Sequence, residues 1–281
     1  MNAIELTNVS KSYKGFSLNN INFAVPQGTI MGLVGENGAG KSTAIKLIMN
    51  AIKRDSGTIT VLGTDNTSKD FTLTKQDIGI VLDEAGFHDI FKVKDINKIM
   101  KAIYKNWNTE QFYAYLERFS IPLNKKIKAF SRGMKMKLAI SVALSHEAKL
   151  LILDEPTSGL DPMIRDEILD VFSEFTRDEN HSVLISSHII SDLEKICDYI
   201  TFIHKGELVL CEEKDKLLDE YAVLKIEEKD FESIPECAIV RKKKTAFGYE
   251  LLVKKNNINN SFTTEKTNLE DIVLFMAKKD T

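Results

Sequence analysis

The chain has 281 residues, of which 43% are hydrophobic and 28% are charged, and its formal net charge at pH 7 is −3. A chain of this length and composition can bury a full core in one large or two modest globular domains. The slightly acidic balance gives no indication of nucleic-acid binding, which usually shows as a basic face or a high pI. No apolar run approaches the roughly 18 residues that a membrane-spanning helix needs, and the first residues lack a signal-peptide pattern. We therefore expect a soluble protein that acts at a membrane only through a partner.

Three cysteines, Cys197, Cys211 and Cys237, are widely spaced and form no C-x-x-C pair. An odd number at such spacing argues against both a disulfide framework and a zinc site. This usage is typical of proteins that fold in a reducing cytosol.

Strands and helices alternate along the first three quarters of the chain. Strands are predicted at residues 4–9, 21–25, 58–62, 78–82, 149–153 and 182–185, and a hairpin at residues 199–210. Apolar residues recur at helical spacing between residues 87 and 145, which predicts three helices, the third after Ser131. Asp161 and Pro162 form a good start for a further helix. The alternation predicts a mostly parallel sheet with helices on both faces.

A glycine-rich loop carries the strongest chemical signal. It follows a buried strand predicted from Thr29 to Val34 and leads into a helix that begins near Lys41 and includes Ile52, with Gly57 as a C-cap or turn. Gly35, Gly40, Lys41 and Ser42 satisfy the phosphate-loop pattern G-x-x-x-x-G-K-[ST]. Lys41 would reach the β- and γ-phosphates, and the Ser42 hydroxyl would hold Mg²⁺. We predict nucleotide binding by the loop residues Gly35, Asn37, Gly38, Ala39, Gly40, Lys41, Ser42 and Thr43.

A second candidate site is the apolar strand that ends in Asp154 and Glu155. Ligands of α/β sheets sit outside the carboxyl ends of the strands, where the phosphate loop also opens. Asp154 would hold Mg²⁺ through water, and Glu155 would polarise the attacking water. Taken alone, the pair would be read as a solvated acidic turn.

The signals weaken beyond about residue 213. Small strands are predicted at residues 223–226, 238–241 and 249–253, and Arg241 to Lys244 is predicted to be a solvated loop. Thr267 and Glu270 are predicted to form a capping box for a last amphipathic helix that includes Met276.

The run from Asp154 to Asp161, DEPTSGLD, resembles the Walker B and D-loop motifs of ATP-binding cassette (ABC) ATPases. Further motifs follow in the family's order. The residues Ser131, Arg132, Gly133, Met134 and Lys135 resemble the signature motif, which is commonly LSGGQ. Ser187 and His188 resemble the switch-histidine loop, and Tyr13 lies where the family stacks an aromatic ring on adenine. The resemblance covers roughly residues 1–215.

This resemblance implies a P-loop NTPase fold of the α/β class, with a RecA-like core and an N-terminal antiparallel β subdomain. It places an inserted helical subdomain at about residues 87–148 within an ATPase domain of residues 1–215. Residues 216–281 are then expected to be a small α+β accessory domain. In the family, two ATP molecules with Mg²⁺ are sandwiched in a head-to-tail dimer, the signature of one subunit meeting the γ-phosphate of the other. His188 is expected to contact that γ-phosphate, and Asp161 is expected to act in the D-loop.

Two departures from the family's pattern concern the signature and the Q-loop. Arg132 replaces the first signature glycine and Met134 replaces the glutamine, a form that resembles exporters whose membrane subunit is a separate chain. Asp83 stands where a Q-loop glutamine is usual, and it can still bind Mg²⁺ through water.

The resemblance implies an ATPase subunit of a split ABC exporter. It would pair with a second ATPase subunit and a transmembrane permease at the cytoplasmic face of the membrane, with peptides or antimicrobial compounds as suggested cargo. One alternative is a soluble ABC protein that acts on ribosomes or DNA, although such proteins carry two cassettes or a long inserted coiled coil. Another is a regulatory module that binds ATP without hydrolysing it, against which Glu155 and His188 argue.

Overall fold

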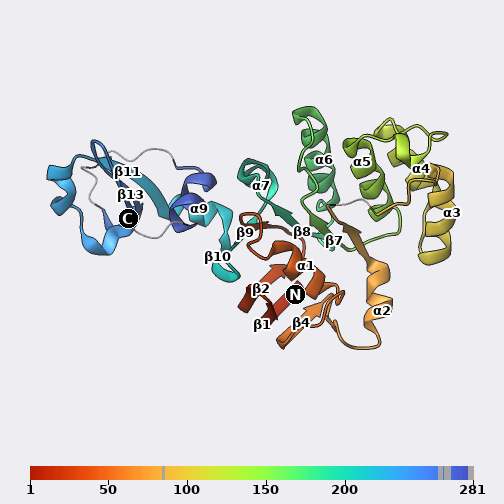
Figure 1. Cartoon of the computed structure of the whole chain (residues 1–281), viewed down its shortest axis with the longest axis horizontal. Coiled ribbons are helices and arrows are strands. Elements are labelled where there is room, and N and C mark those ends of the chain that lie inside the picture. The colour runs from red at the N-terminus through yellow and green to blue at the C-terminus, as the bar shows by residue number, and fades with distance from the viewer. Residues whose placement is uncertain (84–85, 259–261, 263–266, 278–281) are drawn as a thin grey trace.

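The structure, a computed structural model, describes residues 1–83, 86–258, 262 and 267–277. Within these residues the strands form sheets of six, four and three strands. Figure 1 shows the C-terminal elements at the opposite end of the molecule from helices α3 and α4. Within the same described ranges, no helix has both the length and the apolar character needed to cross a bilayer.

The six-stranded sheet forms the centre of the fold, with the strand order β10-β9-β3-β8-β7-β6. Its members are β3 (Ile30–Val34), β6 (Ile78–Val81), β7 (Leu150–Asp154), β8 (Ser182–Ser187), β9 (Tyr199–His204) and β10 (Glu207–Glu213). The strands from β9 to β6 run parallel, and β10 returns antiparallel as the predicted hairpin. β3, β7 and β8 are buried along their whole length, as expected for a parallel sheet covered on both faces. The predicted parallel sheet is therefore confirmed.

A second, antiparallel sheet consists of β2 (Phe16–Pro26), β1 (Asn2–Tyr13), β4 (Ser56–Val61) and β5 (Thr64–Asp65), and it shares a hydrophobic core with the phosphate-loop helix. β1 and β2 are longer than the sequence predicts because their outer ends are polar and lack apolar alternation. The helix α1 (Lys41–Ile48) ends before Ile52, so the expectation that Ile52 lies on it is wrong. Gly57 lies inside β4 with a φ of 82°, rather than capping that helix.

The predicted helices between residues 87 and 145 are α3 (Val93–Ile103), α4 (Thr109–Arg118) and α5 (Arg132–Ala143). A short helix, α2 (Phe71–Thr74), comes before them, and α6 (Pro162–Phe175) and α7 (Ile190–Ile196) come after. The start of α6 confirms the sequence prediction, because the Ile164 amide donates a 3.1 Å hydrogen bond to Oδ1 of Asp161.

The C-terminal elements are α8 (Lys214–Glu220), β11 (Tyr221–Ile226), β12 (Ile239–Thr245), β13 (Gly248–Lys254) and α9 (Leu269–Ala277). The expectation of a loop at Arg241 to Lys244 is wrong, because these residues lie in β12 and pair with β13. β12 is an edge strand, and lysines are common on such strands because they discourage further pairing. The run of basic residues from Arg241 to Lys244 therefore looks like a solvated loop in the sequence.

The predicted capping box of α9 is displaced by one residue. Oδ1 of Asn268 accepts a 2.8 Å hydrogen bond from the Asp271 amide, while the Thr267 hydroxyl accepts one of 2.7 Å from the Val223 amide of β11. Thr267 therefore ties the helix to the small sheet instead of capping it.

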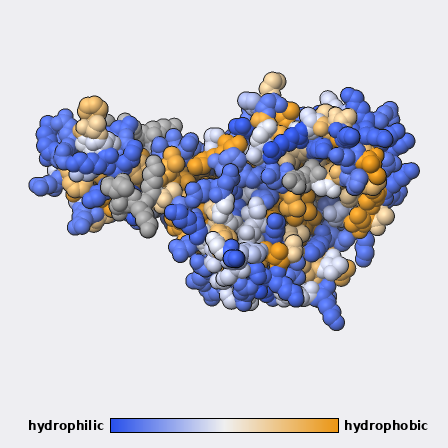
Figure 2. All heavy atoms as spheres, in the orientation of Figure 1, coloured by the Kyte–Doolittle hydropathy of each residue, from blue (hydrophilic) through white to orange (hydrophobic). Residues whose placement is uncertain are grey.

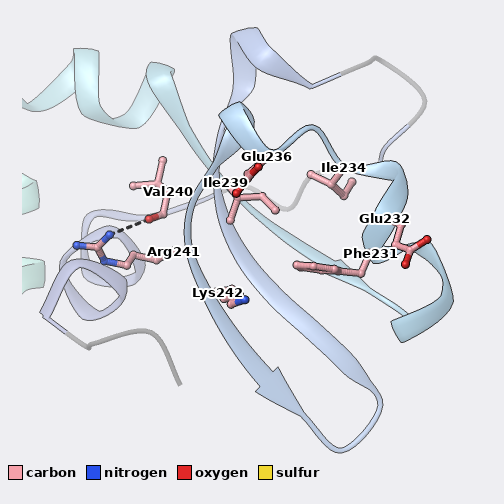
Figure 3. A pocket seen from close by; sticks show the side chains of 8 residues that line it. All are labelled: Phe231, Glu232, Ile234, Glu236, Ile239, Val240, Arg241 and Lys242. Atoms are coloured by element: carbon pink, nitrogen blue, oxygen red, sulfur yellow. Dashed lines mark hydrogen bonds between the residues drawn. The ribbon is translucent and has the colours of Figure 1, made fainter.

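Two packing regions position the C-terminal elements. The three-stranded sheet has a small core of its own, formed by Ala222, Leu224, Ile234, Ala238, Leu251 and Val253. Beside it lies a pocket of about 350 Å³, whose lining includes Phe231, Ile239 and Arg241. Figure 3 shows the Arg241 side chain on the opposite side of β12 from Phe231. By contrast, Leu269, Ile272 and Val273 of α9 join the core of the central sheet.

Candidate nucleotide site

The candidate site lies where three neighbouring parallel strands end. In the central sheet β8 is flanked by β3 and β7, with Val34 beside Ser187 and Asp154 beside Ser186. The residues that follow these strands are the phosphate loop after β3, Glu155 after β7, and His188 after β8. The topology thus brings together motifs that are far apart in the sequence.

Two glycines of the phosphate loop are required by its backbone. A Cβ at Gly35 would lie 2.5 Å from the carbonyl oxygen of Ile203, so the loop can approach β9 only without a side chain. Gly40, at the start of α1, has a φ of 118°, a conformation that L side chains rarely adopt. The free N–H groups and the dipole at the start of α1 favour an anion there.

Lys41, Glu155 and His188 form one continuous chain of contacts. Nζ of Lys41 lies 3.0 Å from Oε1 of Glu155, and it donates a 2.6 Å hydrogen bond to the carbonyl of Gly35. Oε2 of Glu155 lies 2.7 Å from Nδ1 of His188. Lys41 and Glu155 are both buried, so their opposite charges interact in a poorly solvated setting. The lysine predicted to bind phosphate and the glutamate predicted to act as the base are therefore held together.

Ser186 contacts both acidic residues of the candidate site, and the sequence alone did not single it out. Its buried hydroxyl donates a 2.6 Å hydrogen bond to Oδ1 of Asp154 and accepts one of 3.1 Å from the Glu155 amide. The same amide lies 3.2 Å from the Ser186 carbonyl, and Glu155 has a φ of 52°. Ser186 therefore fixes both carboxylates, including a backbone conformation that is costly for glutamate. Its role follows from the register of β7 and β8, which no local motif reveals.

The signature-like residues begin helix α5. The Met134 amide donates a 3.2 Å hydrogen bond to Oγ of Ser131, which is the N-cap residue. Gly133 is buried, and a Cβ there would lie 3.2 Å from Cδ1 of Ile164 on α6. The start of α5 is therefore packed against the start of α6, whose N-cap is Asp161, the residue predicted to act in the D-loop.

The two residues that depart from the family's pattern contact each other. Nη2 of Arg132 lies 2.6 Å from Oδ1 of Asp83, and about half of each side chain is exposed. Arg132 also approaches Gly159, where a Cβ would lie 3.1 Å from its Nη1 atom. The structure therefore pairs Asp83 with the signature, whereas the sequence led us to expect it near Mg²⁺.

Tyr13 lies at the end of β1, next to the hairpin turn, with 46% of its surface exposed. Nζ of Lys11 lies 5.6 Å from the centre of its ring. Phe16, which pairs with Tyr13 across the hairpin, is the aromatic residue closer to the loop, because a Cβ at Gly40 would lie 3.0 Å from its ring. The sequence reasoning singled out Tyr13 and passed over Phe16.

The other predicted loop residues take positions consistent with the turn before α1. Asn37, Gly38 and Ser42 are exposed, Ala39 is buried and Thr43 is half-buried.

Helix α7, which follows His188, is connected to α6 through Arg165, whose guanidinium lies 3.7 Å from Asp192. Burial raises the pKa of the Asp192 carboxyl above its ordinary value.

Comparison with known proteins identifies the family. The sequence profile described as ABC transporter matches residues 18–158, half of the chain. The lantibiotic transport ATP-binding protein SrtF of Streptococcus pyogenes is 34% identical over 215 residues, which cover 75% of this chain and 91% of SrtF. The chain belongs to the ABC transporter family. Its sequence resemblance to ABC ATPases is therefore confirmed.

Further relatives of this ABC subunit agree. The bacitracin transport ATP-binding protein BcrA of Enterococcus faecalis is 34% identical, with 73% of this chain and 68% of BcrA covered. The ABC transporter ATP-binding protein YtrB of Bacillus subtilis is 32% identical, with coverages of 78% and 74%. A solved ATP-binding subunit of an ABC transporter superposes with a TM-score of 0.69 at 25% identity, covering 76% of this chain and 91% of that one. The P-loop NTPase fold is confirmed, and the chain is the ATPase of an ABC transporter. These relatives do not favour the ribosome or DNA alternative.

Proposed function

We propose that this ABC ATPase dimerises on ATP and powers a separate transmembrane permease that exports peptide antimicrobials, at the cytoplasmic face of the membrane. The observation that supports this most is the contact chain from Lys41 through Glu155 to His188, in which a carboxylate lies between an ammonium group and an imidazole. The names of SrtF and BcrA, which refer to lantibiotic and bacitracin transport, support the cargo class.

The proposed residue roles follow from this arrangement. Lys41 and the N–H groups of the phosphate loop bind the β- and γ-phosphates. Glu155 orients the attacking water and accepts its proton, since its carboxylate lies between Lys41 and His188. His188 contacts the γ-phosphate, and Tyr13 stacks on adenine.

Mg²⁺ is the metal that fits the oxygen donors on this side of the loop. Asp154 is buried, with one carboxylate oxygen held by Ser186, and Ser42 lies at the exposed start of α1. A carboxylate and a hydroxyl are hard oxygen ligands, which Mg²⁺ prefers and completes with water and phosphate oxygens. Asp154 and Ser42 would hold the ion, which neutralises charge on the β- and γ-phosphates when bound. Asp83 is a less suitable ligand because Arg132 pairs with it.

The signature residues Ser131, Arg132, Gly133 and Met134 are proposed to act on the second subunit's γ-phosphate, with Asp161 at the contact between subunits. Ser131 caps α5, so the N–H groups and dipole of that helix favour an anion. Within each subunit we propose an ATPase domain at residues 1–215, with a helical subdomain at 87–148, and an accessory domain at 216–281.

An export assay tests the transport proposal. Cells that lack this chain should become sensitive to a lantibiotic and to bacitracin, and the wild-type chain should restore resistance. Lys41→Ala should not restore it, although the protein is expressed and folded. Sensitivity to a non-peptide antibiotic should stay unchanged as a control. Equal resistance with and without the chain would refute the cargo class but would leave the ATPase assignment intact.

A further inference from the structure

Helix α9 forms one wall of a pocket whose opposite wall belongs to the nucleotide site. The pocket has a volume of about 190 Å³ and is mainly apolar. Its lining includes Gly35, Glu36 and His188 from the nucleotide site, and Val273, Leu274 and Ala277 from α9. The C-terminal segment thus reaches the phosphate loop and the switch histidine of its own chain.

Helix α9 is also fixed to the helix that follows the switch histidine. The Leu269 amide donates a 3.0 Å hydrogen bond to Oε2 of Glu194 on α7. Leu269 and Ile272 are fully buried in the same core as Leu193 of α7. Figure 2 shows apolar surface gathered where the C-terminal elements meet the rest of the molecule. Because α7 begins two residues after His188, a shift of α9 would be transmitted to that histidine.

His188 contacts Glu155 through both its ring and its backbone amide, which lies 3.4 Å from Oε2 of Glu155. Its Nδ1 atom lies 2.7 Å from Glu155, and its side chain is 39% exposed. The same residue lines the pocket that Val273 and Leu274 close from the α9 side. Val273 is 4% exposed, whereas Leu274 is 46% exposed and lies at the pocket rim. Changes at Leu274 therefore alter the pocket with little loss of buried packing.

We infer that α9 is a positioning element for His188, which keeps its ring aligned with Glu155. Through His188, the C-terminal segment then affects the rate of ATP hydrolysis, whereas ATP affinity depends on the phosphate loop. This role rests on the proposed function of His188 at the γ-phosphate. Helix α9 itself lies outside residues 18–158, which match the family profile.

Two opposite changes to the pocket test this inference in the full-length chain. Leu274→Ala removes part of the wall, and Ala277→Phe fills the space. Each variant should lower kcat about threefold to tenfold and leave the ATP KM and Kd within about twofold, because a small misplacement of a reacting group affects the chemical step. The matched control Glu270→Gln changes an exposed residue of the same helix outside the pocket lining, and it should leave kcat unchanged.

An imidazole NMR spectrum provides a readout that does not depend on turnover. The chain has five histidines, so the His188 signals can be assigned by their loss in His188→Ala. These signals should shift in Leu274→Ala and Ala277→Phe, and stay in place in Glu270→Gln. Unchanged signals and kcat in both pocket variants would overturn the inference. A loss of ATP affinity as large as the loss of kcat would also overturn the inference, because α9 would then support the phosphate loop and not His188.

The His188→Ala variant separates this inference from the proposed function. If it keeps full turnover, the proposed role of His188 fails. If it abolishes turnover while both pocket variants behave as wild type, only the role of α9 fails.

Discussion

Asp83 and Arg132 form an ion pair of 2.6 Å that joins the end of β6 to the start of α5. Each residue separately departs from the pattern of the family, and the pair replaces two uncharged residues by two opposite charges. Arg132 alone would place a positive charge at the positive end of the α5 dipole, which is unfavourable. Asp83 offsets that charge, so the two departures depend on each other.

We predict that Asp83→Arg and Arg132→Asp will each lower the ATPase rate, and that the double variant will recover part of it. The pair is half-exposed, so its direct contribution to stability should stay within about 1 kcal/mol. A double-mutant cycle of kcat, with thermal melting of all four proteins, measures the coupling. Additive losses in kcat would mean that the contact has no functional role.

Ser186 is predicted to support the two carboxylates, and Ser186→Ala tests this. The change removes the donor to Asp154 and one of the two acceptors of the Glu155 amide, at a cost of about 1–3 kcal/mol. The variant should therefore need more Mg²⁺ for half-maximal ATPase activity and should also have a lower kcat.

Ser187→Ala is the matched control for this test. Ser187 is equally buried, but its hydroxyl accepts a 2.9 Å hydrogen bond from the Ile189 amide and has no role at the carboxylates. The assignment fails if both serine variants show the same Mg²⁺ dependence as wild type.

The sequence was sufficient to predict the phosphate loop and the acidic strand end, because these motifs are local. Residues 30–43 and 150–155 each combine a buried strand with the polar residues that follow it in one short segment. The parallel sheet also followed, since alternating strands and helices allow few other arrangements.

Contacts between distant segments could not be predicted in the same way. The pairing of Ser186 with Asp154 depends on the register of β7 and β8, and that of Asp83 with Arg132 depends on how α5 packs. At the C-terminus, β12 was mistaken for a loop because an exposed edge strand carries the same charges as a loop. The capping residue Asn268 was missed because Thr267 offers the same local chemistry one residue earlier.

The base role of Glu155 predicts that Glu155→Gln will bind ATP but lose hydrolysis. Glutamine keeps the shape of the side chain but cannot accept the proton of water. It also removes the negative charge 3.0 Å from Lys41, which leaves that cation free for phosphate. The ATP Kd should stay equal or fall, while steady-state turnover falls at least about a hundredfold.

Because bound ATP is not hydrolysed, Glu155→Gln should also accumulate as an ATP-bound dimer. Size-exclusion chromatography in the presence of ATP measures this dimer. Glu174→Gln is a suitable control, because Glu174 of α6 is exposed and pairs with Arg118 of α4, away from the candidate site. Normal turnover in Glu155→Gln would contradict the assignment of the base.

A shared site predicts that two different inactive subunits will restore activity when they are mixed. Lys41→Ala removes the cation of the phosphate loop but leaves the signature intact. Gly133→Asp leaves the loop intact but adds a carboxylate near the start of α5, which should repel the γ-phosphate of the other subunit. Each variant alone should be nearly inactive, and Gly133→Asp should bind ATP as a monomer with wild-type affinity.

The mixture should recover a partial rate, because one of its two sites combines the good loop of one subunit with the good signature of the other. Gly133→Ala serves as the control for bulk, since its added Cβ would lie 3.2 Å from Ile164 and requires only a small shift. The rate of wild type should also rise faster than linearly with protein concentration until dimers dominate. No recovery in the mixture, together with full activity of a strictly monomeric wild type, would show that each subunit hydrolyses ATP alone.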